Sequence, residues 1–263
     1  ICLPLAFVNT QVSAHTEHTS KAPTDTKLYL ISPKDGETVD KTFTIKFGLQ
    51  GMGVAPAGIA KDNTGHHHLI IDGKLKVFGE IGAIYAGLTL SDPGFDPYMK
   101  ICERYGIPVA IHTGGGPPNI TYRCCPNFRL ELGDPYKIED VLAKYPKLKI
   151  YMMHAGEAFH EHAIRLMKQY SQLYTDLGVI LWVQDITKDY AEEFLRAAKK
   201  YGLIDRVMYG SDQMVWPQGI DISIETLNNY DFLSEDDKAK IFYHNAAKFL
   251  EFSEEDIKEY HKK

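Results

Sequence analysis

Two different patterns of hydrophobic and polar positions divide the chain. Between Lys27 and Gly73, apolar and polar residues alternate in short runs such as KLYLISP and KTFTIKFGLQ, with turns containing Gly and Pro between them. Alternation with a period of two predicts β-strands that bury one face. The run HHHLIID, which ends at Asp72, is expected to be a third strand. Three strands are too few to close a sandwich, so residues 27–75 are predicted to form a partial, sandwich-like β domain.

From residue 76 the pattern changes to strands that alternate with amphipathic helices. Five short apolar runs predict strands: KVFGEIG, IPVAIHTGG, LKIYMMHAG, LYTDLGV and RVMYGSDQ. Helices are predicted between and after them, in PGFDPYMKICERYG, KIEDVLAKYPK, FHEHAIRLMKQY, YAEEFLRAAKKYG and EDDKAKIFYHNAAKFLEF. Strands that alternate with helices of this length indicate parallel β/α units, so the predicted fold class is α/β.

The two ends of the chain are expected to lie outside these domains. Residues 1–14, ICLPLAFVNTQVSA, have an apolar core followed by small residues, which is typical of the later part of a secretory signal peptide. That interpretation predicts a periplasmic or secreted protein, and an ordinary apolar strand is the alternative. Residues 15–26 are polar and predict a linker, and residues 254–263 predict a polar tail.

Composition and charge narrow the classes of partner. The formal net charge is −6, and no run of Lys or Arg is long enough to attract nucleic acid or a membrane surface, so neither is expected as a partner. Of the four cysteines, Cys2 lies in the expected signal peptide, Cys102 lies on a predicted helix, and Cys124 and Cys125 are adjacent. Neighbouring cysteines rarely bridge each other, so a disulfide scaffold is not expected.

Residues able to bind a metal stand at the ends of the predicted parallel strands. His112, His154 and Asp212 end three of these strands, and Glu80 ends an earlier one. The carboxyl ends of parallel β/α strands meet at one face, which is where barrel enzymes hold their active sites. Imidazole and carboxylate groups suit zinc and related divalent metals. Such a metal makes hydroxide available near neutral pH, and a neighbouring carboxylate can take the proton of the water.

Several of these motifs together resemble a known family. GEIG, IHTGGGPPN, YPKLKIYMMHAGE, LYTDLG, RVMYGSDQMVWP and IFYHNAAKFL look like the second half of the amidohydrolase-related family, over residues 77–252. The resemblance implies a TIM-type (β/α)8 barrel and metal-dependent hydrolase or decarboxylase chemistry. It implies that His112 ends the fifth strand as a metal ligand, and that His154 ends the sixth strand and either binds a second metal or contacts the substrate and the attacking water. Asp212 would be the eighth-strand ligand and proton acceptor, and Glu80 would end the fourth strand.

The chain also departs from that family. The first strand of the family normally supplies an H-x-H pair that completes the metal site, and here the resemblance begins at the fourth strand. The expected fold is therefore a partial barrel, an arc of five parallel strands ringed by helices. In one variant, His66 and His68 replace the missing pair, although HHHLIID would then have to run parallel to the barrel strands with almost no crossover.

The N-terminal part resembles a different family. The stretch SPKDGETVDKTFTIKFGLQGMGVAPAGIAKDNTGHHHLIIDG is similar to the first half of a family of small exported bacterial domains of unknown function that share the TGHHHL motif. On a strand, His66 and His68 would share one face, where they could bind a metal weakly. Hydrogen-bonded imidazoles at a polar strand end are the alternative. The seam between the two resemblances is expected between Asp72 and Phe78.

Other candidate residues follow the strand ends. Arg123 lies on the long loop after His112 and could hold a substrate carboxylate, or could be a solvated loop residue. Trp216 follows Asp212 and could line a substrate pocket or pack its own loop. Gly114 to Gly116 could let a ligand approach the backbone. His160 and His162 lack the H-E-x-x-H spacing, so they are interpreted as surface or loop-contact residues.

Three hypotheses for function remain open from the sequence. The first is an exported metal-dependent hydrolase that acts on a small molecule with a bound divalent metal, expected to be zinc, and that lacks activity if the missing ligands are essential. The second is a non-enzymatic chain made of two partial domains, with strand edges through which a homodimer could form. The third is an exported metal-binding module that uses the HHH strand.

Overall fold

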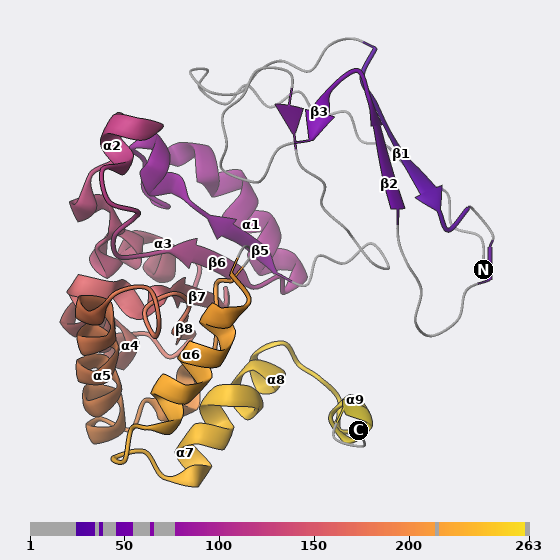
Figure 1. The fold of residues 1–263 in the computed structure, drawn as a ribbon. Coiled ribbons are helices and arrows are strands. Elements are labelled where there is room, and N and C mark those ends of the chain that lie inside the picture. The colour runs from indigo at the N-terminus through magenta and orange to yellow at the C-terminus, as the bar shows by residue number, and fades with distance from the viewer. Residues whose placement is uncertain are drawn as a thin grey trace. The chain divides into compact units, whose positions relative to one another are not determined.

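The computed structural model describes residues 25–34, 37–38, 46–54, 64–65, 77–213 and 216–260 (Figure 1). The chain divides into two compact units, residues 1–70 and 71–263, which are treated separately below. The expected signal peptide at residues 1–14 lies outside the described residues, as do most of the expected linker and the three histidines from His66 to His68.

The first unit contains two small pairs of strands. β1 (Lys27–Ser32) pairs in antiparallel fashion with β2 (Lys46–Gln50), and β3 (Gly53–Val54) pairs in parallel with β4 (Thr64–Gly65). Tyr29 and Gly48 are direct cross-strand partners, and a side chain at Gly48 would overlap the Tyr29 ring. The alternating pattern therefore predicted the first two strands correctly.

The second unit is built on one sheet of five parallel strands in sequential order. These strands are β5 (Phe78–Ile81), β6 (Val109–His112), β7 (Ile150–Met153), β8 (Leu173–Asp176) and β9 (Val207–Met208). Val109, Ile150 and Leu173 are register partners across three strands, and all three are fully buried. Among the described residues, β5 pairs only with β6 and β9 only with β8, so this sheet is an arc with two edges. The predicted α/β arc of five parallel strands is confirmed.

Helices lie between and after the strands of the arc (Figure 1). The α-helices are α1 (Asp96–Tyr105), α2 (Ile120–Arg123), α3 (Glu139–Lys144), α4 (His160–Gln169), α5 (Asp185–Lys200), α6 (Gln218–Asn228), α7 (Glu235–Ala239), α8 (Asn245–Phe249) and α9 (Glu254–Tyr260). Short 3-10 turns are η1 (Ala83–Ala86), η2 (Pro93–Phe95), η3 (Leu130–Gly133), η4 (Pro135–Ile138), η5 (His154–Phe159) and η6 (Ile204–Arg206), and η7 (Lys240–His244) is a π-helical turn.

The five predicted helical stretches all contain observed helices, whereas α2 and α6 were not predicted. The last predicted helix is interrupted by the π-helical turn η7, which separates α7 from α8. Helix α6 was not predicted, because its isoleucines at 220, 222 and 224 alternate with polar residues instead of following a helical period. Part of the expected polar tail is the helix α9.

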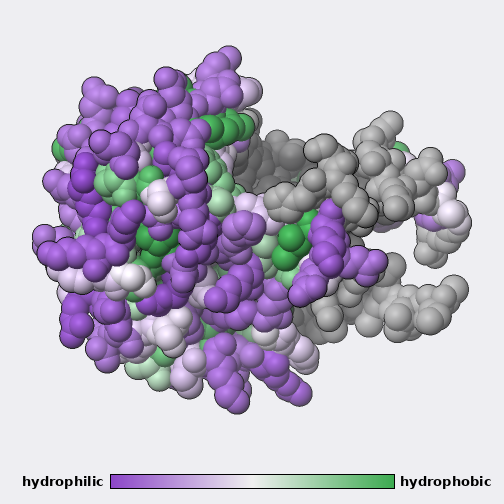
Figure 2. All heavy atoms as spheres, turned by 90° about the horizontal axis from the view of Figure 1, so that it is seen from below, coloured by the Kyte–Doolittle hydropathy of each residue, from purple (hydrophilic) through white to green (hydrophobic). Residues whose placement is uncertain are grey.

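The core of the second unit lies between the sheet and its helices. Fully buried side chains come from the strands and from the facing sides of the helices, including Met167 on α4 and Phe194 and Leu195 on α5. Figure 2 shows mostly hydrophilic side chains on the face in view, with hydrophobic ones in smaller groups. Within the described residues, no helix is long and apolar enough to cross a membrane.

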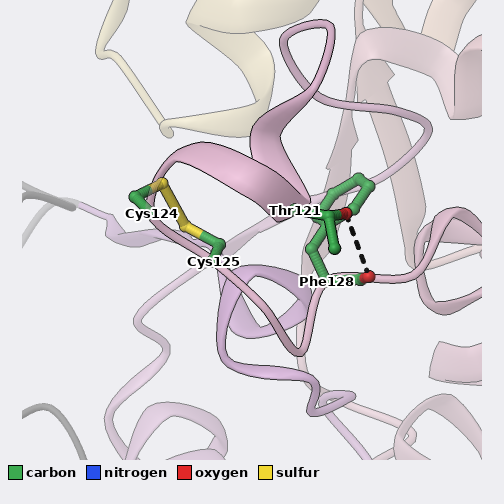
Figure 3. The surroundings of a disulfide bond; sticks show 4 residues. All are labelled: Thr121, Cys124, Cys125 and Phe128. Atoms are coloured by element: carbon green, nitrogen blue, oxygen red, sulfur yellow. Dashed lines mark hydrogen bonds between the residues drawn. A yellow bond between two sulfur atoms is a disulfide. The ribbon is translucent and has the colours of Figure 1, made fainter.

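The adjacent cysteines differ from the expectation. Cys124 and Cys125, which follow α2 on the long loop after β6, are joined by a disulfide bond (Figure 3). The expectation that they would not bridge was therefore wrong. Its basis was the geometry that is usual for bridged cysteines, and this pair forms within a tight turn. Cys102 is a buried free thiol on α1.

Candidate metal centre

Three side chains from neighbouring strand ends converge at the carboxyl face of the arc. They are Glu80 of β5, His112 at the end of β6, and His154 directly after β7, and their potential ligand atoms all lie within 4.8 Å of one another. His112 Nδ1 lies 2.7 Å from Glu80 Oε1 and 3.2 Å from His154 Nε2. The third separation, from His154 Nε2 to Glu80 Oε1, is 3.6 Å.

The far side of each imidazole is held by a backbone carbonyl. His112 Nε2 donates to the carbonyl of Gly115 at 2.6 Å, and His154 Nδ1 donates to the carbonyl of Gly178 at 2.9 Å. A carbonyl can only accept, so these bonds place the hydrogen of each neutral ring on the far nitrogen. The two near nitrogens then carry lone pairs that face each other and a carboxylate oxygen. Three acceptors this close repel one another unless a proton or a cation lies between them.

The donor set fits a divalent cation. Ligand nitrogen and oxygen atoms bound about 2.1 Å from a tetrahedral zinc lie roughly 3.4 Å from one another. Two of the three separations, 3.2 and 3.6 Å, are close to this value, and the third, 2.7 Å between His112 and Glu80, is that of a hydrogen bond. Metal-bound histidines usually donate their second ring N–H to a carbonyl or a carboxylate, as both His112 and His154 do. The residues present can therefore hold a metal through one carboxylate and two imidazoles.

The pKa values of Glu80 and His154 both shift in the direction that favours the charged side chain. Burial alone raises the pKa of Glu80, but its hydrogen bonds with His112 and His154 outweigh this effect and hold the pKa well below its usual range. Burial alone lowers the pKa of His154, but the carboxylates of Glu80 and Asp176 and the Gly178 carbonyl raise it to about 9. The local field therefore favours positive charge between these groups.

Glu80 reaches the centre through an irregularity of β5. Phe78 pairs with Val109 and Ile81 pairs with Ile111, so β5 has one more residue than β6 over this stretch. An inserted residue of this kind turns a side chain away from its regular direction. Gly79 has a φ of 155°, and a Cβ there would lie 2.6 Å from the Cβ of Ala110, so only glycine fits beside β6.

His154 is held by an unusual turn after β7. The residues from His154 to Glu157 all have positive φ values, between 47° and 75°. Non-glycine residues adopt such values rarely, and they keep them where several contacts enforce the conformation. The backbone N–H of His154 donates to Asp176 Oδ1 at 3.0 Å, and the N–H of Gly156 donates to the buried Thr113 hydroxyl at 3.1 Å.

Asp176 is a residue of this centre that the sequence interpretation missed. It ends β8, is buried, and accepts hydrogen bonds from the backbone N–H groups of His154 and Gly178. Burial raises the pKa of its carboxyl, while His154 and the two backbone donors lower it, and the pKa stays above its usual value. A signal is present in LYTDLG, where an Asp ends a predicted strand as His112 and His154 do.

Asp212 lies beside His154 but is not one of the three converging groups. It follows β9 with a φ of 52°, and the small Gly178 separates it from His154. A Cβ at Gly178 would lie 3.3 Å from the Asp212 Cβ and 3.4 Å from His154 Nδ1. Burial raises the pKa of Asp212, His154 lowers it, and Glu80 and Asp176 raise it further, so that its pKa lies above the usual value. A role for Asp212 as a metal ligand remains a prediction.

Two aromatic rings, which we call the aromatic wall, close one side of the centre. The Tyr85 ring packs edge-on against His112 with centroids 5.1 Å apart, and Phe128 packs against Tyr85 at 5.6 Å. Burial raises the pKa of the Tyr85 hydroxyl, and the charges of Glu80, Asp212 and Glu157 raise it further, so this phenol is neutral. The sequence interpretation missed this wall, because Tyr85 is distant in sequence from the histidine that it contacts.

The triple glycine packs against neighbouring segments. A Cβ at Gly114 would lie 2.5 Å from the Glu157 Cβ, and one at Gly116 would lie 3.2 Å from the Phe128 ring. Gly114 N–H donates to the carbonyl of Gly133, and Gly115 N–H donates to the Glu157 carboxylate. These glycines therefore allow the loops after β6 and β7 to approach each other closely.

The remaining predicted site residues lie further out. Arg123 is exposed at the end of α2. Trp216 is 62% exposed and packs edge-on against Trp182. His162 contacts both carboxylate oxygens of Asp134 and stacks on Tyr136, which agrees with its interpretation as a loop-contact residue. His66 and His68 lie outside the described residues.

Comparison with known proteins identifies the family. The sequence pattern of the amidohydrolase family matches residues 72–252, which is more than half of the chain. The chain belongs to this amidohydrolase family. A domain of unknown function matches residues 45–83, so both of the resemblances seen in the sequence are confirmed. The two matches overlap at residues 72–83 of the chain.

Individual relatives are distant from this chain in sequence. Protein fluG of Emericella nidulans is 22% identical over 163 residues, which cover 56% of this chain and 18% of that protein. An uncharacterized TIM-barrel protein from Bordetella bronchiseptica is 25% identical, with a TM-score of 0.49, and the match covers 64% of this chain and 55% of that one. A dihydroxybenzoic acid decarboxylase from Polaromonas sp. JS666, solved with bound manganese, is 16% identical, with a TM-score of 0.46 and coverages of 65% and 57%. The chain thus spans little more than half of these two structures and less than a fifth of fluG.

Proposed function

We propose that the five-strand arc holds one divalent metal, expected to be zinc, and that the chain is a metal-dependent hydrolase of a small molecule. The observation that carries this proposal is the convergence of Glu80 Oε1, His112 Nδ1 and His154 Nε2, with both imidazoles held from behind by carbonyls. Acceptors arranged in this way are stabilised by a cation or a proton between them, and a divalent metal satisfies all three at once. Family membership supports the same chemistry.

The residues around this centre have distinct proposed roles. A bound divalent cation would lower the pKa of a coordinated water, so that hydroxide is available near neutral pH. Asp212, beside His154, would accept the proton of that water and return it to the leaving group. The neutral Tyr85 hydroxyl is a donor on the same side as His112, where it can orient a substrate oxygen. Asp176 would hold the His154 backbone in place.

Elemental analysis of the purified chain tests the metal site. We expect about one equivalent of divalent metal in the unmodified protein and its loss in His112→Ala, because one of three converging ligands is removed. The matched control is His162→Ala. His162 contacts Asp134 and is not one of the three converging groups, so this variant should keep the metal. An unmodified chain that is folded and free of metal after growth with added zinc would contradict the proposal.

The variant Asp212→Asn assigns the role of that carboxylate. Retained metal together with lost hydrolysis of an activated ester, such as p-nitrophenyl acetate, would make Asp212 the proton acceptor alone. Lost metal would make it a ligand as well, as the strand-end pattern predicts. Unchanged hydrolysis in this variant would remove Asp212 from the proposed mechanism.

A further inference from the structure

The disulfide between Cys124 and Cys125 is not used by the proposed hydrolysis. The pair stands at the end of α2 on the loop that follows His112 (Figure 3). Cys124 is exposed and Cys125 is partly exposed, whereas Cys102 is buried. A thiolate breaks a disulfide by reaching one of its sulfur atoms, so exposure makes this bond available for exchange.

A compact turn connects the pair to a buried aromatic ring. The backbone N–H groups of Cys124 and Cys125 both donate to the Ile120 carbonyl at 3.2 Å, and the N–H of Phe128 donates to the Cys125 carbonyl at 3.0 Å. Arg129 Nη1 donates to the carbonyls of Pro126 and Phe128 at 2.9 and 2.6 Å. The position of Phe128 therefore depends on a hydrogen-bonded turn that contains the disulfide.

The same turn is docked on the segment that follows Glu80. Phe128 is 8% exposed and packs on Tyr85, which packs on His112. Beside this contact, Asn127 lies so close to Gly87 that a Cβ at Gly87 would be 2.7 Å from the Asn127 Cβ. The turn thus contacts Tyr85 within η1 and Gly87 directly after η1. The turn η1 itself begins two residues after Ile81 of β5.

We propose that Cys124 and Cys125 form a reversible dithiol–disulfide pair whose oxidised form fixes Phe128 and with it the aromatic wall of the metal centre. The part of this proposal that concerns the centre rests on the proposed function, while the exchange chemistry of the pair does not. The export predicted from residues 1–14 would place the pair where disulfides form readily.

The reaction partner is a low-molecular-mass thiol. Its thiolate attacks the exposed Cys124 sulfur, the bond between the two cysteines breaks, and the electron pair leaves on the Cys125 sulfur, which takes a proton. A second thiol attacks the mixed disulfide and releases Cys124, which also gains a proton. Two external thiols are thereby oxidised to one disulfide, and the protein gains two electrons and two protons. The reverse exchange restores the oxidised turn.

Alkylation followed by peptide mapping tests the exchange. In the native oxidised protein, N-ethylmaleimide should leave Cys124 and Cys125 unmodified, and after incubation with dithiothreitol it should modify both. Buried Cys102 should stay unmodified in both states. Phenylarsine oxide should then bind the reduced protein in a one-to-one ratio, since its arsenic forms two bonds to sulfur as its oxygen leaves as water. Cys102→Ala should retain this binding and Cys124→Ser should lose it.

Two results would overturn the exchange chemistry. One is a pair of free thiols in protein purified under air, and the other is a disulfide that native incubation with dithiothreitol leaves intact. Because these measurements need no metal, they are independent of the metal content that tests the proposed function.

Amide hydrogen exchange of the metal-free protein tests the link to the aromatic wall. We expect peptides that cover residues 83–87 and 124–133 to exchange at least several-fold faster in the reduced protein and in the double variant Cys124→Ser, Cys125→Ser. A peptide from α5, residues 185–200, is the control and should be unchanged. Equal exchange of the wall peptides in both states would overturn the link, and it would leave the proposed metal site untouched.

Discussion

At the scale of single residues, the centre depends on which nitrogen of each imidazole carries its hydrogen. The carbonyls of Gly115 and Gly178 accept from the far nitrogens of His112 and His154, so in the neutral rings the near nitrogens are acceptors that face the centre. Preorganisation of this kind means that little rearrangement accompanies metal binding. In the metal-free protein the same acceptors repel one another unless a proton lies between them.

That proton makes the stability of the metal-free protein depend on pH. The pKa of buried His154 is about 9 in the folded state, against 6.5 for the unperturbed residue, so its protonation stabilises the fold fully below pH 6.5. This stabilisation is lost as the pH rises through 9. We expect the free energy of unfolding, measured in urea from pH 6.5 to 9.5, to fall by about 3 kcal/mol.

Two controls define this effect. His154→Gln should lack the decrease, while His162→Ala should keep it, because the partner of His162 lies outside the centre. Saturating zinc should reverse the trend, since the metal requires neutral imidazoles and protons compete with it as the pH falls. A free energy of unfolding that does not change with pH in the metal-free, unmodified protein would contradict the raised pKa of His154.

Gly178 allows three groups of the centre to meet. A Cβ there would lie 3.1 Å from Asp176 Oδ1, 3.3 Å from the Asp212 Cβ and 3.4 Å from His154 Nδ1. We expect Gly178→Ala to lower the free energy of unfolding by about 1–3 kcal/mol, because a methyl group is inserted into a packed site. Gly94→Ala is the control, since a Cβ at Gly94 has nothing within 4 Å. Chemical denaturation of both variants gives the comparison, and equal stabilities would contradict the argument.

At the scale of elements, the centre is positioned by the residues at and just after the strand ends. The strands of the arc have two to four residues each, and the centre is made where they end. The left-handed turn from His154 to Glu157 is held by Asp176 from β8, by Thr113 after β6, and by the contact of Glu157 with Gly115. Neighbouring loops therefore impose a conformation that the turn residues would not adopt alone.

Thr113 tests this dependence of one element on another. Its buried hydroxyl donates to the carbonyl of Met153 at 2.5 Å and accepts from the N–H of Gly156. We expect Thr113→Val to destabilise the fold by about 2–4 kcal/mol, because two buried backbone groups lose their partner without a change of shape. Thr113→Ser keeps the hydroxyl and should stay within about 1 kcal/mol of the original protein in the same denaturation assay. A loss of stability in Thr113→Ser that is absent from Thr113→Val would contradict the argument and assign the effect to the methyl group.

The elements also show how far sequence patterns reach. All five strands of the arc and five of the helical stretches around them follow from local periodicity, because buried strands and amphipathic helices have a regular spacing of apolar residues. Helix α6 has no helical spacing of apolar residues, since its isoleucines alternate with polar residues and are exposed. The disulfide of Cys124 and Cys125 was missed because a tight turn decides whether neighbouring sulfur atoms can meet.

At the scale of the whole molecule, the chain matches two different families, whose matches overlap at residues 72–83. The family matches cover residues 45–83 and 72–252, and the three converging groups, from Glu80 to His154, all belong to the amidohydrolase match. The edges of the arc remain a predicted route to a homodimer, because β5 and β9 each have one partner strand among the described residues.

The two histidine sets can be separated by variants of the whole chain. We expect the double variant His66→Ala, His68→Ala to keep the metal content of the unmodified protein, because the proposed centre is made by the second unit. His112→Ala should lose that metal. Metal analysis of both proteins, purified side by side, measures this difference. Metal lost from the double variant and retained in His112→Ala would favour the alternative of a binding module on the HHH strand.

The sequence by itself determined the order of strands and helices, the family, and His112 and His154 as candidate ligands, because these features depend on residues that are local in the chain. Only the tertiary structure decided that Glu80 completes the converging set, that Asp176 positions His154, and that Tyr85 and Phe128 form a wall beside His112. These contacts join segments that are tens of residues apart. The physical reason is that strand register, a bulge in β5 and a left-handed turn after β7 set the direction of each side chain. None of these three features produces a periodic pattern of apolar residues from which it could be predicted.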